Sequence, residues 1–315
     1  MDDKMKLLVT PYKNPDLDGT ACAFGYAEFL RKNEKDAMAA IFGKPHREAQ
    51  FVLDKFNILA LENAEKMVDN VDGIIIVDAS DLRGLSDKIQ PDKVVEIIDH
   101  RKIHEAHKFP NAEAQIELVG SAATLIAEKF YNNKTTISPE SAELLFSAIV
   151  SNTINFQANV TTERDHKMAD WLKTKFSLPK NYVHEMFSDK SQFKKSLKET
   201  IIDDFATFNF NNHNLGIAQL EIINVNEFIR ENLVEIRKIL EELKKEKTLD
   251  LIFLTCIDLE KAFNEIVVID EDTQKFVEQA LEVNFKDGVT KRDRILMRKE
   301  IVPLIKEVLE TGKLS

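Results

Sequence analysis

The stretch GIIIVD, residues 73–78, consists of a glycine and four apolar residues followed directly by a carboxylate. A short continuous apolar run of this kind is typical of a β-strand that is buried on both faces. The segment KVVEIIDH, residues 93–100, has the same form and ends at Asp99 and His100. Because strands buried on both faces are characteristic of parallel sheets, these two runs predict an α/β fold for this part of the chain.

Strand-like and helix-like segments alternate on both sides of these two runs. Lys6–Thr10 is predicted to be a strand, and Thr20–Lys32 carries apolar residues at helical spacing. Further strands are expected over Ala37–Phe42 and Ile116–Val119, and further helices over Glu48–Phe56, Ser121–Tyr131, Pro139–Ser151 and Asp165–Phe176. This alternation predicts a parallel sheet in the N-terminal domain.

A short, polar and charged segment, Phe187–Lys195, suggests a domain boundary. We therefore predict an N-terminal domain over residues 1–187, a linker over 188–195 and a C-terminal domain over 196–315. In the C-terminal part, strands are expected over Leu215–Ile223, Leu249–Ile257 and Asn264–Ile269, and helices over Val225–Lys247 and Ile301–Leu309. These segments predict a second, smaller α+β domain.

The composition is that of a water-soluble globular protein. The chain has 315 residues, a net charge of −11 and only two cysteines, Cys22 and Cys256, which lie far apart in the sequence. The acidic balance argues against duplex nucleic acid as a partner, and the cysteine count argues against a disulfide framework. The sequence has neither a secretory signal nor an apolar run of membrane-spanning length, so we expect a cytoplasmic protein without a membrane partner.

Acidic or imidazole side chains follow three of the predicted strands. Asp16 and Asp18 lie in NPDLDG, residues 14–19, and the other two positions are Asp78 and His100. In open parallel sheets, ligands bind beyond the carboxyl ends of the strands, so these side chains are expected to converge. Carboxylates that converge repel one another unless a cation neutralises their charge. Carboxylate oxygens and an imidazole nitrogen are suitable ligands for Mn²⁺ or Mg²⁺. The alternative is that each aspartate caps the helix that follows it. For any single aspartate, helix capping is the favoured interpretation. Acidic or imidazole side chains at three strand ends together favour a metal site.

Four segments, in this order, resemble the DHH phosphoesterase superfamily: NPDLDG at 14–19, VDASD at 77–81, IIDHRK at 97–102 and ELVGSAATLIAEKF at 117–130. Within it the chain looks most like the manganese-dependent (family II) inorganic pyrophosphatases and the related prune-type exopolyphosphatases. LMRKEIVPLI at 296–305 and GIAQLEI at 216–222 resemble their C-terminal DHHA2 domain. The resemblance therefore spans nearly the whole chain.

The resemblance implies a metal-dependent phosphohydrolase with its active site in a cleft between a DHH and a DHHA2 domain. One or two divalent ions, Mn²⁺ or Mg²⁺, would activate a water that cleaves a phosphoanhydride, in pyrophosphate or short polyphosphate, or a small phosphoester. By position, Asp78 would bridge two metals, Asp16 would bind one, and Asp18 and His100 would bind the other. Asn152 stands at a further ligand position. The resemblance is also compatible with a homodimer.

The same resemblance assigns residues to the phosphorylated substrate. Arg101, in place of the second histidine of the DHH motif, would contact phosphate, and the resemblance implies that Asp78, His100 and Arg101 are the catalytic residues. In the tail, Arg298 and Lys299 would hold the terminal phosphates. Ser121 opens a predicted helix whose N–H groups could bind an anion, or it is an ordinary helix N-cap.

The chain departs from the pyrophosphatase pattern at several positions that bind metal or substrate there. Histidine is replaced by Tyr12 and Arg101, aspartate by Asn152, and lysine and arginine by Ala206 and Met297. These changes remove ligands and cations, and arginine cannot act as a general acid or base near neutral pH. The alternative function is therefore a catalytically weakened family member that binds a phosphorylated ligand or a protein partner.

Overall fold

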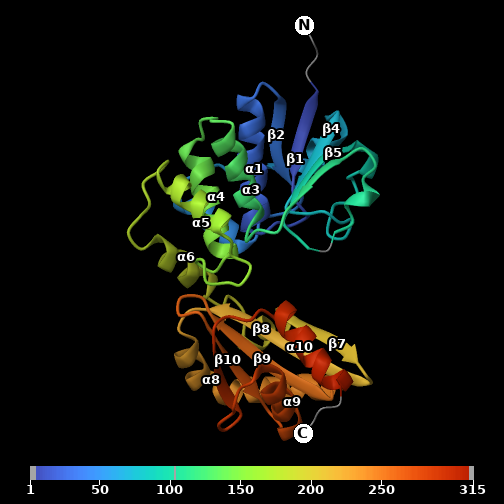
Figure 1. Ribbon diagram of the computed structural model, residues 1–315, viewed down its shortest axis with the longest axis vertical. Coiled ribbons are helices and arrows are strands. Elements are labelled where there is room, and N and C mark those ends of the chain that lie inside the picture. The colour runs from blue at the N-terminus through green and yellow to red at the C-terminus, as the bar shows by residue number, and fades with distance from the viewer. Residues whose placement is uncertain (1–4, 103, 312–315) are drawn as a thin grey trace. The chain divides into compact units, whose positions relative to one another are not determined.

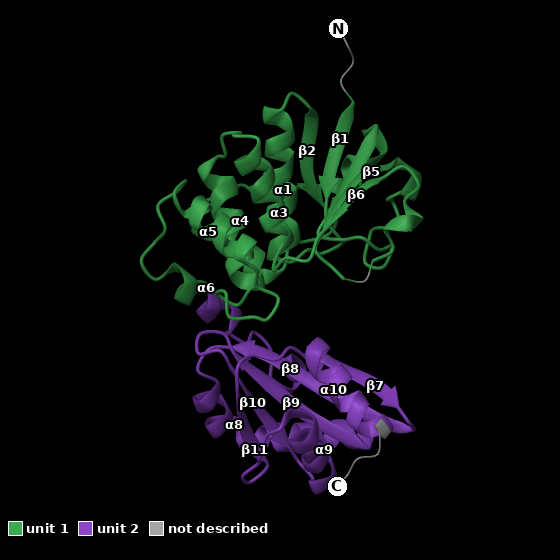
Figure 2. Ribbon diagram, viewed as in Figure 1, with its two compact units in different colours: residues 1–186 green, residues 187–315 purple. Residues whose placement is uncertain are grey.

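A computed structural model describes residues 5–102 and 104–311, and it divides the chain into two compact units (Figure 2). The first unit covers Met1–Met186 and the second Phe187–Ser315. Each unit has its own β-sheet. None of the helices in the described ranges combines the length and the apolar character needed to cross a membrane.

The first unit is built on a six-stranded sheet with the strand order β3-β2-β1-β4-β5-β6, in which every pairing is parallel. The strands are β1 (Lys6–Thr10), β2 (Asp36–Ile41), β3 (Glu62–Asn63), β4 (Gly73–Val77), β5 (Val94–Asp99) and β6 (Glu113–Ile116). All five residues of β4 are buried, as its continuous apolar run predicts. The predicted parallel α/β sheet is thus confirmed.

One face of this sheet is covered by helices and the other by short segments (Figure 1). The helices of the unit are α1 (Leu17–Lys32), α2 (Arg47–Lys55), α3 (Ala122–Asn132), α4 (Pro139–Asn152) and α5 (Glu163–Lys173), and α6 (Tyr182–Lys190) contains the boundary to the second unit. Helices α1, α3 and α4 pack against one another. On the other face, Ile74 and Ile76 of β4 pack with Ala64 and Val68 of two short 3₁₀ turns.

The second unit contains a five-stranded mixed sheet with the strand order β11-β10-β9-β8-β7. Its strands are β7 (Phe205–Phe210), β8 (His213–Ile222), β9 (Leu251–Asp258), β10 (Phe263–Val268) and β11 (Val289–Asp293), and its helices are α7 (Leu197–Asp203), α8 (Val225–Glu246), α9 (Glu271–Leu281) and α10 (Arg298–Thr311). Only β8 and β9 pair in parallel. The predicted smaller domain with both helices and strands is thus confirmed.

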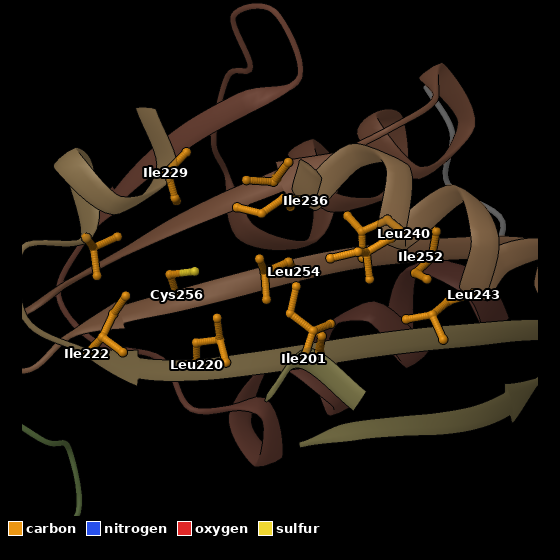
Figure 3. Close-up of a cluster of buried hydrophobic side chains, with 14 of the residues drawn as sticks. Ile201, Leu220, Ile222, Ile229, Ile236, Leu240, Leu243, Ile252, Leu254 and Cys256 are labelled. Atoms are coloured by element: carbon orange, nitrogen blue, oxygen red, sulfur yellow. The ribbon is translucent and has the colours of Figure 1, made fainter. Parts of the chain in front are cut away.

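Alternation along β9 gives this sheet two buried faces. Leu254 and Cys256 pack against the apolar stripe of α8, which includes Ile236 and Leu240 (Figure 3). Phe253 belongs to the opposite face, in the cluster that holds residues of α9 and α10. Side chains that point to alternate sides of a strand therefore explain the unbroken apolar run of β9.

Several sequence-based boundaries differ from the structure. β6 ends at Ile116, so the predicted strand Ile116–Val119 is wrong beyond its first residue, and Val119 lies in the turn before α3. Residues 188–190 of the proposed linker form the end of α6, in which Phe187 is buried. Helix α10 begins at Arg298, and Pro303 lies inside it. Strands β3, β7 and β11 and helices α6, α7 and α9 have no counterpart among the predicted elements.

Candidate metal centre

The loop NPDLDG connects β1 to α1 and positions two carboxylates. Asp16 is the N-cap of α1, and its Oδ1 accepts a hydrogen bond from the N–H of Gly19 at 3.0 Å. The capping alternative therefore holds for Asp16. Asp18 lies in the first turn of α1, one residue beyond Leu17, and its side chain is completely buried.

The carboxylate of Asp18 is held by three N–H groups from other helices. The backbone N–H groups of Ala122 and Ala123, in the first turn of α3, donate to it at 2.9 Å each. The side-chain amide of Asn152, at the end of α4, donates to Oδ2 at 2.5 Å. The N-terminus of α3 thus stabilises a buried anion that belongs to the protein itself.

Asp78 directly follows β4 and has a left-handed backbone conformation, with φ at 54°. Its N–H donates to the carbonyl oxygen of Ile98 in β5 at 2.8 Å, which continues the sheet pairing to the strand end. Asparagine and aspartate tolerate this conformation better than most residues, although it still costs free energy. A strained backbone at a buried carboxylate is consistent with a functional position.

His100 follows β5 and directs one ring nitrogen at both carboxylates. Its Nδ1 lies 2.9 Å from the carbonyl oxygen of Val119. A carbonyl can only accept, so Nδ1 carries the proton of this hydrogen bond. Its Nε2 lies 3.5 Å from Oδ1 of Asp78 and 3.8 Å from Oδ2 of Asp18. Histidines that bind metals usually donate their other N–H group in this way.

These three residues form a group that could hold a cation. One ligand atom each from Asp18, Asp78 and His100 lies within 4.8 Å of the others. Carboxylate oxygens with one imidazole nitrogen suit Mn²⁺ or Mg²⁺. The donor set therefore fits the divalent metal that the sequence predicts.

The electrostatics of this group favour bound positive charge. Burial raises the pKa of Asp78 well above its usual value, and the charges of Asp18 and Asp16 raise it further. Burial also raises the pKa of Asp18. In contrast, burial lowers the pKa of His100, but its interactions with Asp78 and Asp18 outweigh burial and raise this pKa to about 10. Without a metal, protons supply the positive charge that the buried carboxylates need.

Arg101 is the next residue along the chain. Its Nη2 donates to the backbone carbonyl of Asp78 at 2.9 Å, and its guanidinium lies 3.7 Å from Asp81 and 3.8 Å from Asp99. It also lies 5.8 Å from the centre of the Tyr12 ring. Arg101 is therefore fixed beside the candidate metal group.

Ser121 is the N-cap of α3, and its hydroxyl accepts a hydrogen bond from the N–H of Ala123 at 3.2 Å. This confirms the capping interpretation of Ser121. Because two N–H groups of this helix terminus donate to Asp18, they are engaged inside the protein. A contact between Ser121 and substrate stays a prediction.

Family models match both parts of the chain: the N-terminal domain of the DHH family matches residues 6–149, and the DHHA2 domain matches residues 184–308. The manganese-dependent inorganic pyrophosphatase of Methanocaldococcus jannaschii is 32% identical over 309 residues, which cover 94% of this chain and 96% of that relative. The chain belongs to the DHH family and carries a DHHA2 domain. The predicted resemblance is confirmed.

Two solved structures share this architecture. A crystal structure assigned to family II of the inorganic pyrophosphatases, from Methanococcus jannaschii, is 31% identical, with a TM-score of 0.69 over 96% of this chain and 99% of that one. An exopolyphosphatase-related protein from Bacteroides fragilis is 13% identical, with a TM-score of 0.53 over 99% of this chain and 94% of that one. The second structure supports the DHH–DHHA2 fold alone.

The structure shows what two residues do where this DHH–DHHA2 chain departs from the pyrophosphatase pattern. The hydroxyl of Tyr12 accepts a hydrogen bond from the N–H of Asp16 at 3.0 Å, so Tyr12 fixes the loop that carries the two aspartates. Asn152 presents its amide nitrogen to Asp18. Asp16 lies close enough to raise the pKa of Asp78, but its carboxylate is outside the group of three. Metal ligation by Asp16 and Asn152 stays a prediction.

The basic residues of the DHHA2 domain belong to the second unit. The guanidinium of Arg298 donates to Oδ1 of Asp204 at 2.6 Å and to the carbonyl oxygen of Asp204 at 2.7 Å. Its backbone N–H donates to Oε1 of Gln219 at 2.7 Å. Lys299, the next residue, is exposed. Asp204 was not among the predicted site residues, and the structure identifies it as the partner of Arg298.

Proposed function

We propose that this chain is a divalent-metal-dependent phosphohydrolase that cleaves a phosphoanhydride bond, in pyrophosphate or a short polyphosphate. The observation that carries the proposal is the group of two buried carboxylates, Asp18 and Asp78, and the partly buried His100, in which the His100–Val119 hydrogen bond directs Nε2 at both carboxylates. The similarity to a manganese-dependent inorganic pyrophosphatase over nearly the full length supports the same reaction class.

In this proposal, Asp18, Asp78 and His100 hold Mn²⁺ or Mg²⁺, as one or two ions, with Asp16 and Asn152 as further ligands. A metal held there would supply Lewis acidity toward a phosphoryl oxygen and would lower the pKa of a bound water. Arg101 supplies a fixed positive charge and a planar set of donors for phosphate oxygens. Arg298 and Lys299 supply cations for the terminal phosphates of a small substrate.

A second candidate function is binding without efficient turnover, of a phosphorylated ligand or a protein partner. Two observations favour it. Asn152 contributes a neutral amide at a ligand position, and Arg298, assigned to phosphate, is already paired with Asp204. Both features weaken the contribution of these residues to metal or substrate binding.

Phosphate release separates the two candidates. We would incubate the protein with pyrophosphate, tripolyphosphate or a dinucleotide in the presence of Mn²⁺, Mg²⁺ or Co²⁺, with Asp78→Asn as the matched control. Metal-dependent phosphate release that Asp78→Asn abolishes supports the phosphohydrolase. Binding of these compounds without phosphate release supports the second candidate. If no metal stabilises the protein and no phosphate is released, the proposed function is wrong.

A further inference from the structure

A further buried carboxylate, Asp165, contacts the loop between Val119 and Ser121. It is fully buried near the start of α5 and accepts hydrogen bonds from four donor groups. The N–H and the hydroxyl of Thr162 donate to its Oδ2 at 2.7 Å each, and the hydroxyl of Thr124 in α3 donates to Oδ1 at 2.5 Å. The fourth donor is the N–H of Gly120, at 2.9 Å from Oδ2 and 3.1 Å from Oδ1.

The contact with Gly120 matters because of the residues on either side of it. Val119 accepts the hydrogen bond from Nδ1 of His100, and Ser121 caps the helix whose first N–H groups hold Asp18. Asp165 thus anchors Gly120, which lies between the carbonyl group that supports His100 and the helix terminus that supports Asp18. A Cβ at Gly120 would lie 2.5 Å from Thr153 and 3.0 Å from Oδ2 of Asp165, so the loop is also held by close packing.

We infer that Asp165 is a positioning residue for the metal centre, which sets the orientation of His100 and the position of the α3 terminus without touching the metal. This inference rests on the proposed function, because it concerns the same site. Charge-assisted hydrogen bonds are strong and directional, so a buried carboxylate with four donors can fix this loop. Outer residues that orient metal ligands typically change metal affinity by about 10- to 100-fold when they are replaced.

A merely structural role would have different consequences. Asp165 also caps α5 together with Thr162, so its loss would lower stability in either case. Only a positioning role changes the environment of the His100 ring and the affinity for metal in protein that remains folded.

The test compares Asp165→Asn with Glu28→Gln. Glu28 is a matched control, because it is a buried carboxylate of the same unit that accepts hydrogen bonds from Ser138 and Ser141. It lies ten residues after Asp18 in α1, which is about 15 Å along the helix. We would measure the affinity for Mn²⁺ by calorimetry and the Nδ1–H proton resonance of His100 by NMR in the metal-free proteins.

We expect Asp165→Asn to lower the affinity for Mn²⁺ by about tenfold and to shift the His100 resonance, whereas Glu28→Gln changes neither. A folded Asp165→Asn variant with wild-type affinity and an unchanged resonance would overturn the inference. If Asp165→Asn does not fold, Thr124→Val serves instead, because it removes one hydrogen bond to Asp165. The same two measurements on Thr124→Val then test the inference. If the wild-type protein binds no Mn²⁺, the proposed metal function fails, and the His100 resonance of the metal-free variants still decides whether Asp165 positions the ring.

Discussion

The side-chain amide of Asn152 donates a hydrogen bond to Oδ2 of Asp18, across 2.5 Å between the end of α4 and the first turn of α1. A neutral donor therefore stabilises this buried carboxylate when no metal is bound. The same donor occupies an oxygen that faces His100, so it competes with a cation for Asp18.

Asn152→Asp should have opposite effects on the metal-free and the metal-bound protein. A second carboxylate against Asp18 replaces attraction by repulsion, so we expect the metal-free protein to lose about 1–3 kcal/mol of stability. With Mn²⁺ present, the added anionic ligand should raise metal affinity. Denaturant unfolding in EDTA and in Mn²⁺ measures both effects. Asn152→Ala is the control, because it removes the competing hydrogen bond without adding charge, so any rise in its metal affinity should be smaller than that of Asn152→Asp. Equal destabilisation of Asn152→Asp with and without Mn²⁺ would argue against a ligand position.

Asp78→Asn should affect the proposed metal centre most, because Asp78 is buried in the group of three and is predicted to bridge two ions. An amide keeps the size of the side chain but removes its negative charge. We expect Mn²⁺ affinity to fall by at least about 100-fold, with loss of metal-dependent stabilisation and hydrolysis. Calorimetry checks the affinity. Asp81→Asn is the matched control, because Asp81 also pairs with Arg101 but is not one of the three ligands. Wild-type affinity in Asp78→Asn would remove Asp78 from the centre.

Much of this centre could be predicted from sequence, because local patterns encode it. The apolar runs before Asp78 and His100 identify buried parallel strands, and parallel strands place their carboxyl ends at one edge of a sheet. The contacts that complete the centre are not local. Asp165 and Gly120 are 45 residues apart, and Asn152 and Asp18 are 134 residues apart. No periodic pattern predicts which distant polar groups will meet. The Thr-x-x-Asp spacing of Thr162 and Asp165 indicates a helix start, but not a contact with Gly120.

In the second unit, the elements predicted from sequence are again those with a strong local pattern of apolar residues. Helix α8 has an apolar stripe along 22 residues, and β9 is buried along its whole length, so both were predicted. Strand β7 alternates half-buried and exposed residues at the edge of the sheet, and it was missed. Its position is determined mainly by pairing with β8, which the sequence of β7 alone does not show.

Metal binding should release protons and strengthen as the pH rises. His100 has a pKa of about 10 in the metal-free protein, against an ordinary value of 6.5, and must lose its proton before Nε2 can bind an ion. Because this pKa is raised, the charged imidazole stabilises the metal-free protein. Its contribution is fully present below pH 6.5 and is lost as the pH rises to about 10. We therefore expect Mn²⁺ affinity to increase by up to about tenfold per pH unit between pH 6 and 8.5 for each proton released.

Calorimetry in two buffers with different ionisation enthalpies counts the released protons. His100→Gln should bind Mn²⁺ more weakly and release about one proton fewer than the wild-type protein. A pH-independent affinity in the wild-type protein would mean that His100 is not a ligand, and an unchanged proton count in His100→Gln would lead to the same conclusion.

Arg101 should set the preference among phosphorylated substrates. Its guanidinium is fixed by the carbonyl of Asp78 and by Asp81 and Asp99, so it offers a permanent positive charge beside the metal group but no exchangeable proton near neutral pH. Substrates with more phosphate oxygens or a better leaving group need less acid catalysis. We therefore expect tripolyphosphate to have a higher kcat/KM than pyrophosphate in the wild-type protein.

Arg101→His should shift this ratio toward pyrophosphate, because imidazole can exchange a proton near neutral pH. Arg101→Lys is the control, since it keeps the charge but loses the planar set of donors, and it should lower both kcat/KM values without reversing the ratio. We would measure both substrates with Mn²⁺ and with Mg²⁺ for all three proteins. If the wild-type protein already prefers pyrophosphate and Arg101→His leaves the ratio unchanged, Arg101 does not determine substrate choice. In that case the departures at Tyr12 and Asn152, which Arg101→His leaves in place, become the next positions to test.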